Sequence, residues 1–199
     1  MYTEPTFAER LRRCPAAARP FHELVGAAGR AAGGPHRDHL DRIARALAQA
    51  PELWRPIARH DPVARWYAHL LHTDALEVWL IGWEIGQDIQ LHDHGRSSGA
   101  VAVCDGVLDE QHTRLDRTGP LRARRHDRTT TFSFGPSYVH DLGNTGPAPA
   151  TSVHVYAPPL THMNFYEHTG AGVRPIRSVP VTGPDPGVPR RVTGDLVAP

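Results

Sequence analysis

Two histidines near the middle of the chain, His92 and His94, are separated by one residue, in a segment that begins at Gly86. Residues i and i+2 of a β-strand point to the same face, so both imidazoles can face a barrel interior and bind one metal ion through neutral ring nitrogens. A third ligand must come from another strand, and His140, which follows a Gly-Pro turn, is the candidate. A lone His-x-His pair is a weak signal, but histidines on two glycine-punctuated strands predict a metal site.

The strands that must position these histidines belong to a predicted antiparallel β-structure. From Leu76 onward the apolar period changes to two and turn residues become frequent. No predicted helix interrupts this region, so a closed barrel or sandwich is favoured over a parallel βαβ fold. The predicted strands are Leu76–Trp83, Ile89–His94, Ala100–Val107, Leu108–Arg114, Thr129–Phe134, Tyr138–Leu142 and Thr151–Ala157.

The first 72 residues are predicted to be helical. Thr6 and Glu9 form a capping-box pattern before a short helix, and Gly33-Gly34-Pro35 separates it from a second one. That second segment, around residues 37–48, carries apolar residues at three- and four-residue spacing, which is typical of an amphipathic helix that packs on another surface. A third helical stretch is expected from about Val63 to Leu71. Residues 1–72 are therefore predicted to form an N-terminal helical cap of the same domain as a barrel over 73–170.

Composition and charge exclude several classes of protein. The 199 residues suffice for one domain, and 22 basic against 21 acidic residues give a formal charge of +1. Every basic residue is an arginine, and the densest cluster, Arg122 to Arg128, contains Asp127 and is interpreted as a solvated face. We therefore expect no nucleic-acid partner and no membrane association, and a monomer is plausible.

Features outside the barrel indicate an intracellular protein. The two cysteines lie 90 positions apart without a CxxC motif, which fits a reducing cytoplasm, and the N-terminus lacks the features of a secretory signal. No apolar stretch approaches the roughly 20 residues that span a bilayer. Residues 171–199 form a Pro- and Gly-rich tail in which 173–181 is a possible extra strand.

The spacing of these motifs resembles that of the cupin superfamily of small jelly-roll barrels. Many cupins have a glutamate ligand four or five residues after the second histidine, whereas this chain has Ser98 and Gly99 there. In combination, the motifs resemble the cysteine dioxygenase family from about Trp54 to Glu167. The residues that carry the resemblance are Trp83, Gly86, Gln87, His92, Asp93, His94, Gly106, Leu108, His140, Asn144 and the run from Ser152 to Pro159.

The resemblance implies a mainly β fold, a cupin jelly-roll barrel with an N-terminal α-helical cap. It also implies a non-haem Fe(II) enzyme that binds a small thiol through a site of His92, His94 and His140. Such an enzyme inserts both atoms of O2 into sulfur, and L-cysteine to cysteine sulfinate is the expected reaction. The family's outer-sphere catalytic triad would here be Ser152, His154 and Tyr156.

The alternation of residues 152 to 156 agrees with this role. Ser152, His154 and Tyr156 share one face of a strand, and the two intervening valines share the other. A polar face inside a barrel is costly unless its members satisfy one another or a ligand. We therefore expect the Tyr156 hydroxyl to reach the metal-bound ligands, with His154 holding it and Ser152 orienting His154. The alternative is a solvent-exposed polar face with the valines packed inward.

The largest departure from the family concerns the substrate carboxylate. Cysteine-specific members carry a Tyr-x-Arg segment whose arginine pairs with that carboxylate, and the matching segment here is Tyr67-Ala68-His69. A histidine is charged only when protonated and lacks the guanidinium fork, so the replacement is not conservative. His69 binds the carboxylate as an imidazolium, or Arg65 or Arg96 replaces it, or the substrate is another thiol such as 3-mercaptopropionate.

A second departure concerns a cysteine that some members link covalently to the active-site tyrosine. Gly99 occupies that position, so we expect an unmodified Tyr156, and Cys104 is expected to be buried, inert and on the opposite face. Ile81 and Met163 are further candidates for the substrate pocket by family position.

The other histidines carry weaker expectations. Surface loops are favoured for His162 and His168 over a place at the pocket mouth, and His112 and His126 are expected to face solvent. Two rival functions remain: a non-catalytic metal- or ligand-binding cupin, and a cupin isomerase or cyclase that uses zinc or nickel.

Overall fold

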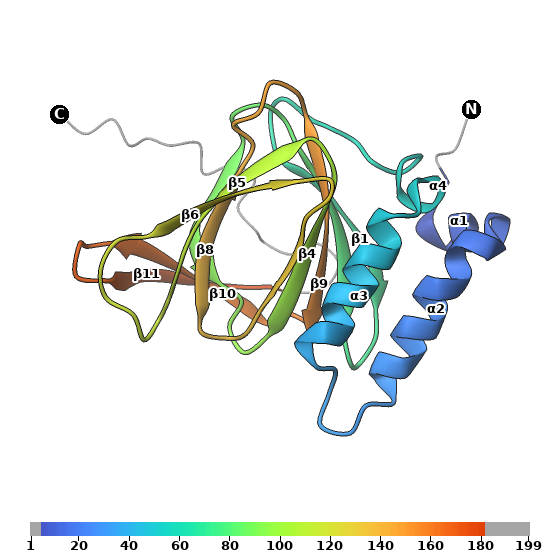
Figure 1. Ribbon diagram of the computed structural model, residues 1–199, viewed down its shortest axis with the longest axis horizontal. Helices are drawn as coiled ribbons and strands as arrows, with labels where there is room; N and C mark the ends of the chain where they lie inside the picture. Colours follow the sequence, from blue (N-terminus) through green and yellow to red (C-terminus); the bar gives the residue numbers. More distant parts are fainter. Residues whose placement is uncertain (1–4, 182–199) are drawn as a thin grey trace.

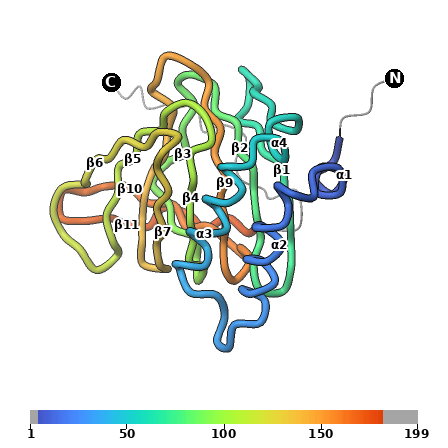
Figure 2. The backbone as a smooth tube through the Cα atoms, turned by 45° about the vertical axis from the view of Figure 1, so that its right-hand side comes forward, coloured from blue at the N-terminus to red at the C-terminus, as the bar shows by residue number. Residues whose placement is uncertain are grey.

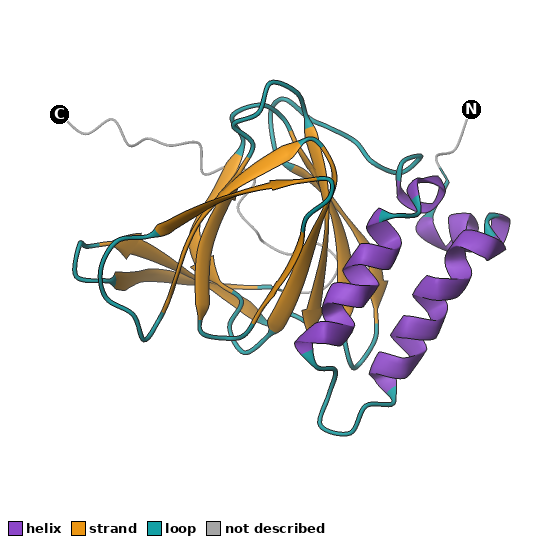
Figure 3. Ribbon diagram, in the orientation of Figure 1, coloured by secondary structure: helices purple, strands orange, loops and turns teal. Residues whose placement is uncertain are grey.

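Two antiparallel sheets face each other and form the barrel of this protein. A computed structural model describes residues 5–181, and Figures 1 and 3 show the two sheets enclosing an interior, with the helices on one side. The predicted class, mainly β with an N-terminal helical cap, is confirmed. One sheet has the order β1 (Trp66–His72), β2 (Glu77–Trp83), β9 (Ala150–Ala157), β4 (Ser98–Asp105) and β7 (Thr131–Phe134). The other has the order β11 (Val173–Pro180), β10 (His162–His168), β3 (Asp88–Asp93), β8 (Tyr138–Gly143), β5 (Val107–Arg114) and β6 (Arg122–Asp127).

The helical cap covers the outer face of the five-stranded sheet (Figure 2). It consists of α1 (Phe7–Arg13), α2 (Pro15–Gly29), α3 (Arg37–Ala48) and α4 (Pro51–Trp54). The predicted capping box is present: Thr6 Oγ1 accepts from the Glu9 N–H at 3.2 Å, and Glu9 Oε2 accepts from the Thr6 N–H at 2.7 Å. The apolar stripe of α3 packs on the sheet as expected, with Leu40, Ile43 and Leu47 fully buried. None of the helices in residues 5–181 is long and apolar enough to cross a membrane.

The cap decides which face of β9 points inward. Val153 and Val155 belong to the same apolar cluster as the α3 side chains, so this face of the strand is covered by the cap. The alternate residues Ser152, His154 and Tyr156 must then face the barrel interior. Every residue of β9 is buried, which contradicts the alternative of a solvent-exposed polar face.

The helix expected over Val63–Leu71 is wrong, because β1 occupies this segment. Trp66–His72 pairs in antiparallel register with β2, and Tyr67 lies opposite Ile81. A short run rich in aromatic and leucine residues fits either period, and the unpaired edge of β2 decides in favour of the strand. The barrel therefore begins inside the range that was assigned to the cap.

Two strands of the six-stranded sheet were missed by the sequence analysis. β6 has the sequence RARRHD, which has no apolar alternation, and its pairing with β5 is visible only in the fold. β10 contains His162 and His168, which were expected in loops, and it pairs with β3 and with β11. The extra strand expected over 173–181 is confirmed as β11, whereas the rest of the predicted tail, 182–199, lies outside the described residues.

Candidate metal centre and active-site cavity

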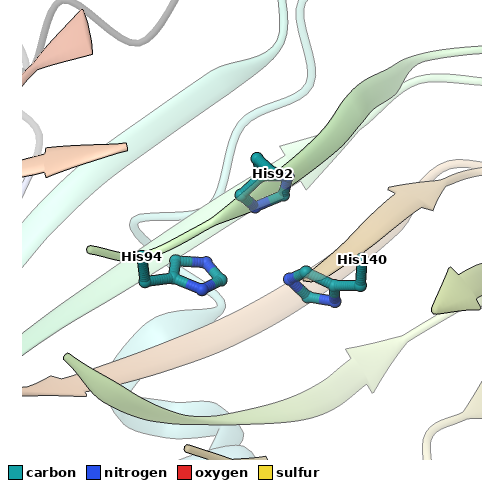
Figure 4. A group of neighbouring side chains, drawn as sticks. All are labelled: His92, His94 and His140. Atoms are coloured by element: carbon teal, nitrogen blue, oxygen red, sulfur yellow. The ribbon is translucent and has the colours of Figure 1, made fainter. Parts of the chain in front are cut away.

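The structure brings His92, His94 and His140 together inside the barrel. His92 lies on β3 opposite His140 of β8, and His94 follows directly after β3. All three are buried, and one ring nitrogen of each lies within 4.8 Å of the others. Figure 4 shows the three imidazoles converging from the two strands. The i, i+2 spacing and the cross-strand register together produce this cluster.

The nitrogens of this cluster suit a divalent cation. The Nδ1–H of His92 donates to the Gln90 carbonyl oxygen at 2.7 Å, and the Nδ1–H of His140 donates to Glu110 Oε1 at 2.8 Å. These bonds leave Nε2 of both rings as the acceptor nitrogen. Both nitrogens of His94 are buried without a hydrogen-bond partner in the described chain. Burial lowers the pKa of His92 and of His94 well below the usual value, so these imidazoles are neutral and can each offer a nitrogen lone pair to a metal ion.

Glu110 on β5 supports the cluster from behind, and the sequence analysis missed it. This carboxylate is 1% exposed and accepts hydrogen bonds from His140, from His126 Nε2 at 2.9 Å and from the Tyr138 hydroxyl at 3.1 Å. Burial raises the pKa of Glu110, but the hydrogen bonds from His126 and His140 outweigh it and hold that pKa well below its usual value. A glutamate on a strand is normally expected to face solvent, so only its register with β8 reveals the contact with a histidine ligand.

The polar face of β9 forms the expected chain of hydrogen bonds. Ser152 Oγ lies 2.8 Å from His154 Nε2, and His154 Nδ1 lies 3.1 Å from the Tyr156 hydroxyl. The Trp83 indole N–H donates to Ser152 Oγ at 2.9 Å, which extends the chain by one residue. Burial lowers the pKa of His154 to about 3 and raises the pKa of Tyr156 above its usual value, so both groups are neutral at pH 7.

A small cavity of about 50 Å³ lies beside the histidine cluster and is also lined by Tyr156. Tyr67, Ile81 and Met163, which the family positions indicated, all line it, whereas His69 and Arg96 do not. Arg96 lies exposed in the turn after His94. The remaining lining residues are Arg65, Trp79, Trp83, Ile89, His92, His140, Leu142, His154, Tyr156 and Leu160.

Arg65 is the cation of this cavity. It is 8% exposed, its Nη1–H donates to the Asp88 carbonyl oxygen at 2.9 Å, and its guanidinium carbon lies 4.8 Å from the Trp83 ring centre. Its Nε–H has no hydrogen-bond partner in the described chain, and no carboxylate of residues 5–181 forms an ion pair with it. Burial lowers the pKa of Arg65 to about 10, so the group remains charged at pH 7.

His69 contacts a glutamate instead of the cavity. Its ring is stacked on Trp79, with ring centres 4.0 Å apart, and its Nε2 lies 3.3 Å from Glu77 Oε2. The other Glu77 oxygen accepts the Leu160 N–H at 3.0 Å. His69 therefore contacts a buried carboxylate and does not line the cavity.

Gly99 and Cys104 lie as the strand alternation predicted. Gly99 is opposite Tyr156, and a Cβ atom added there would lie 2.4 Å from Phe134 Cζ and 3.1 Å from Tyr156 Cδ1. Phe134 thus occupies the space that a side chain at position 99 would need. Cys104 is buried on the opposite face, among the residues under the helical cap, and burial raises the pKa of its thiol.

Two histidines that were expected to face solvent are buried. His126 is 3% exposed, and its ring is stacked on Phe132 with centres 4.3 Å apart. His112 is 6% exposed and is stacked on Tyr138. The expectation failed because both histidines alternate with polar and charged residues, so the sequence marks neither face of β5 or β6 as internal. His162 is half-buried and His168 is exposed, at the two ends of β10.

Comparison with known proteins identifies the family. Residues 36–169, about two thirds of the chain, match the family described as cysteine dioxygenase type I. The chain belongs to this family. The matched residues include all three histidines of the cluster and the polar residues of β9. The family description indicates a dioxygenase, and His92, His94 and His140 are placed so that they could hold a metal ion.

The chain is also similar to solved structures. One is a protein from Thermus thermophilus, with 18% identity and a TM-score of 0.45 over 53% of this chain and 93% of that one. A second, from Bacillus halodurans, has 24% identity and a TM-score of 0.41, and the match covers 57% of this chain and 79% of that one. A cupin-family protein with a double-stranded β-helix fold from Methanocaldococcus jannaschii has 13% identity and a TM-score of 0.42, and the match covers 51% of this chain and 86% of that one.

Proposed function

We propose that this protein is an Fe(II)-dependent thiol dioxygenase that converts L-cysteine to cysteine sulfinate. The observation that carries the proposal is one cavity lined by two histidines of the cluster, by His154 and Tyr156 of the β9 chain and by a buried arginine, with His94 completing the cluster. The reaction is balanced as thiol plus O2 giving sulfinic acid: two S–O bonds form, the O–O bond breaks, sulfur loses four electrons and O2 gains them. No further reductant is required.

The histidine cluster would hold the iron through the available nitrogens of His92, His94 and His140. Three neutral ligands without a carboxylate leave a divalent ion its full charge, and the ion would favour the thiolate form of the substrate and supply O2 activation. Glu110 orients His140 and balances part of this charge, as outer-shell carboxylates do in metal sites.

Arg65 would bind the substrate carboxylate. It is charged, buried and without a carboxylate partner in the described chain, and it lines the same cavity as His92 and His140. A guanidinium offers two parallel N–H donors to a carboxylate, which gives both affinity and orientation. Of the three candidates from the sequence, Arg65, His69 and Arg96, only Arg65 lines the cavity, and this supports its assignment.

The β9 chain would deliver one hydrogen-bond donor to the reacting atoms. The Trp83 indole can only donate, so Ser152 accepts from it, and the Ser152 proton then has His154 Nε2 as its acceptor. The neutral His154 consequently donates from Nδ1 to the Tyr156 oxygen. This polarity leaves the Tyr156 O–H directed to another acceptor, and a substrate or oxygen ligand in the cavity would accept it.

The cavity walls would select a small substrate and limit water. A cavity of about 50 Å³ admits only a small substrate. Ile81, Leu142 and Met163 supply apolar contacts around the histidines. Removal of water strengthens the interactions of Arg65 and Tyr156 with a bound anion.

A second candidate substrate is a thiol carboxylate without an amino group, such as 3-mercaptopropionate. No acidic side chain is among the described residues that line the cavity, so none is placed to pair with the ammonium group of cysteine. This feature favours a substrate that is recognised by its carboxylate alone.

O2 consumption by the Fe(II)-loaded protein tests the proposal. Cysteine, 3-mercaptopropionate, cysteamine and homocysteine are compared, and products are identified by mass spectrometry. We expect a sulfinate from cysteine, with one O2 consumed per thiol, and no turnover by His140→Ala. A sulfinate only from 3-mercaptopropionate would establish the second candidate. If iron is bound and none of the four thiols is oxidised, a non-catalytic cupin is favoured.

A further inference from the structure

A second, larger cavity lies outside the site described above. It has a volume of about 410 Å³ and is bounded by the start of α3, by β5 and β6, and by the turn that joins β7 to β8. Five arginines line it, and no acidic residue is among its described lining residues. We call this cavity the arginine groove; its arginines are Arg37, Arg114, Arg117, Arg122 and Arg124.

Strand alternation selects the arginines that face the groove. On β6, Arg122 and Arg124 point to one side, whereas Arg125 points to the other and pairs with Asp109 through bonds of 2.9 and 3.1 Å. On β5, His112 lies directly opposite Arg122 and also lines the groove. The cluster that the sequence suggested to be a single solvated face is therefore divided between two environments.

The positive charge in the groove is compensated only in part. Arg114 bonds to Asp116 at 3.1 Å, and no ion pair within residues 5–181 joins the other four arginines to a carboxylate. Glu110 is the nearby acid on β5, but its oxygens accept from His126, His140 and Tyr138. Several like charges around one concave surface repel each other and raise the local concentration of anions.

One polar atom of a residue that lines the groove lacks a hydrogen-bond partner in the described chain. His112 is 6% exposed, and its Nε2 has no hydrogen-bond partner in the described part of the chain. Its ring is stacked on Tyr138 with centres 5.2 Å apart, and Tyr138 is stacked on Phe134 at 5.3 Å. Phe134 in turn contacts the ring of His94, so these aromatic rings separate the groove from the metal centre. Tyr138 and Phe134 thus form an aromatic wall of the groove.

We propose that the arginine groove binds a small molecule that carries two or more phosphate groups, such as a nucleoside diphosphate. Guanidinium groups form paired hydrogen bonds with phosphate oxygens, and five of them line this cavity. The volume lies in the range of ligand pockets, roughly 300–1,000 Å³, and exceeds what one phosphate requires. A concave site of this volume suits a compact ligand better than an extended nucleic-acid backbone. This assignment does not depend on the thiol dioxygenase proposal.

Calorimetric titration of the iron-loaded protein with ADP, at fixed salt concentration and without magnesium, tests the assignment. We expect saturable binding with a dissociation constant below about 1 mM, and weaker binding of AMP because one phosphate is missing. The double variant Arg122→Gln/Arg124→Gln is expected to weaken ADP binding by at least about tenfold, since it removes two charge-assisted donors. The matched control Arg12→Gln/Arg13→Gln, on the exposed face of α1, should bind ADP as the parent protein does.

Three results would overturn the assignment. They are the absence of saturable ADP binding at millimolar concentration, an equal loss in the groove and control variants, and tighter binding of a single-stranded oligonucleotide than of ADP. Thermal unfolding and iron content verify that each variant is folded and loaded. Arg117→Gln replaces the double variant if the latter does not fold, because position 117 lies in an exposed turn.

Discussion

Oε1 of Glu110 lies 2.8 Å from Nδ1 of His140, and this contact links an anionic side chain to one of the three histidines of the proposed metal site. The same carboxylate also holds His126 and Tyr138, so one residue of β5 fixes the orientation of side chains from β6 and β8. The charge of Glu110 makes Nε2 of His140 more basic, and therefore a stronger metal ligand.

Glu110→Gln should therefore weaken metal binding. We expect a loss of about 10- to 100-fold in Fe(II) or Co(II) affinity, measured by anaerobic titration, because the amide preserves the shape but removes the charge. Glu52→Gln, on the exposed side of α4, is the matched control and should bind metal normally. Equal affinities of Glu110→Gln and the parent protein would show that the contact is only structural.

Tyr156→Phe should slow turnover without loss of iron. The substitution removes the hydroxyl at the end of the Trp83–Ser152–His154 chain, and we expect kcat to fall by about 100-fold or more. Ser152→Ala should lower kcat by a smaller factor, because Ser152 acts only through the orientation of His154. Ser178→Ala, on the exposed β11, is the control. An unchanged kcat in iron-loaded Tyr156→Phe would remove Tyr156 from the mechanism.

Arg65→Gln should raise KM for thiols that carry a carboxylate. The loss of a charged hydrogen-bond partner, about 1.5–3 kcal/mol, corresponds to an increase of roughly 10- to 150-fold in KM. Neither Arg96→Gln nor His69→Gln should produce this change, since neither side chain lines the cavity. Steady-state kinetics with cysteine and 3-mercaptopropionate provide the measurement. A large KM effect in His69→Gln, with Arg65→Gln unaffected, would reassign the carboxylate partner.

Because of Glu77, the free energy of unfolding should decrease as the pH falls in the acid range. Burial raises its pKa, but the neighbouring His69 and the Leu160 N–H hold that pKa below the usual value. The carboxylate therefore stabilises the fold above its unfolded pKa of about 4.3, and this contribution is lost as the pH falls through the folded pKa. Glu77→Gln should melt below the parent protein at pH 7, and thermal scans should show the difference shrinking below about pH 4. A difference that stays constant down to about pH 3 would contradict this.

Gly99→Ala should destabilise the barrel through overpacking against Phe134. The added Cβ would lie 2.4 Å from Phe134 Cζ, so the ring must move, at a cost of about 1–3 kcal/mol. Phe134→Leu combined with Gly99→Ala should recover part of this loss, because the smaller side chain leaves room. Urea unfolding of both single variants and the double variant measures the coupling. Additive effects would mean that Phe134 is not the obstacle.

The sequence by itself determined the features that depend on local alternation. His92 and His94 share a face because they are two residues apart on a strand, and the same rule unites Ser152, His154 and Tyr156. The amphipathic segment at residues 37–48 likewise predicted a helix with one buried face. These features depend on periods of 2 and 3.6, which the chain carries whatever its neighbours are.

Only the tertiary structure decided which side chains meet across strands. Arg65 lines the cavity while His69 faces Glu77, and Glu110 reaches His140, because strand order and register set these neighbours. Arg122–Asp127 becomes a strand for the same reason: it pairs with β5, which precedes it in the chain, although its own residues carry no apolar period. Pairing partners and register are properties of the whole sheet, and no short segment encodes them.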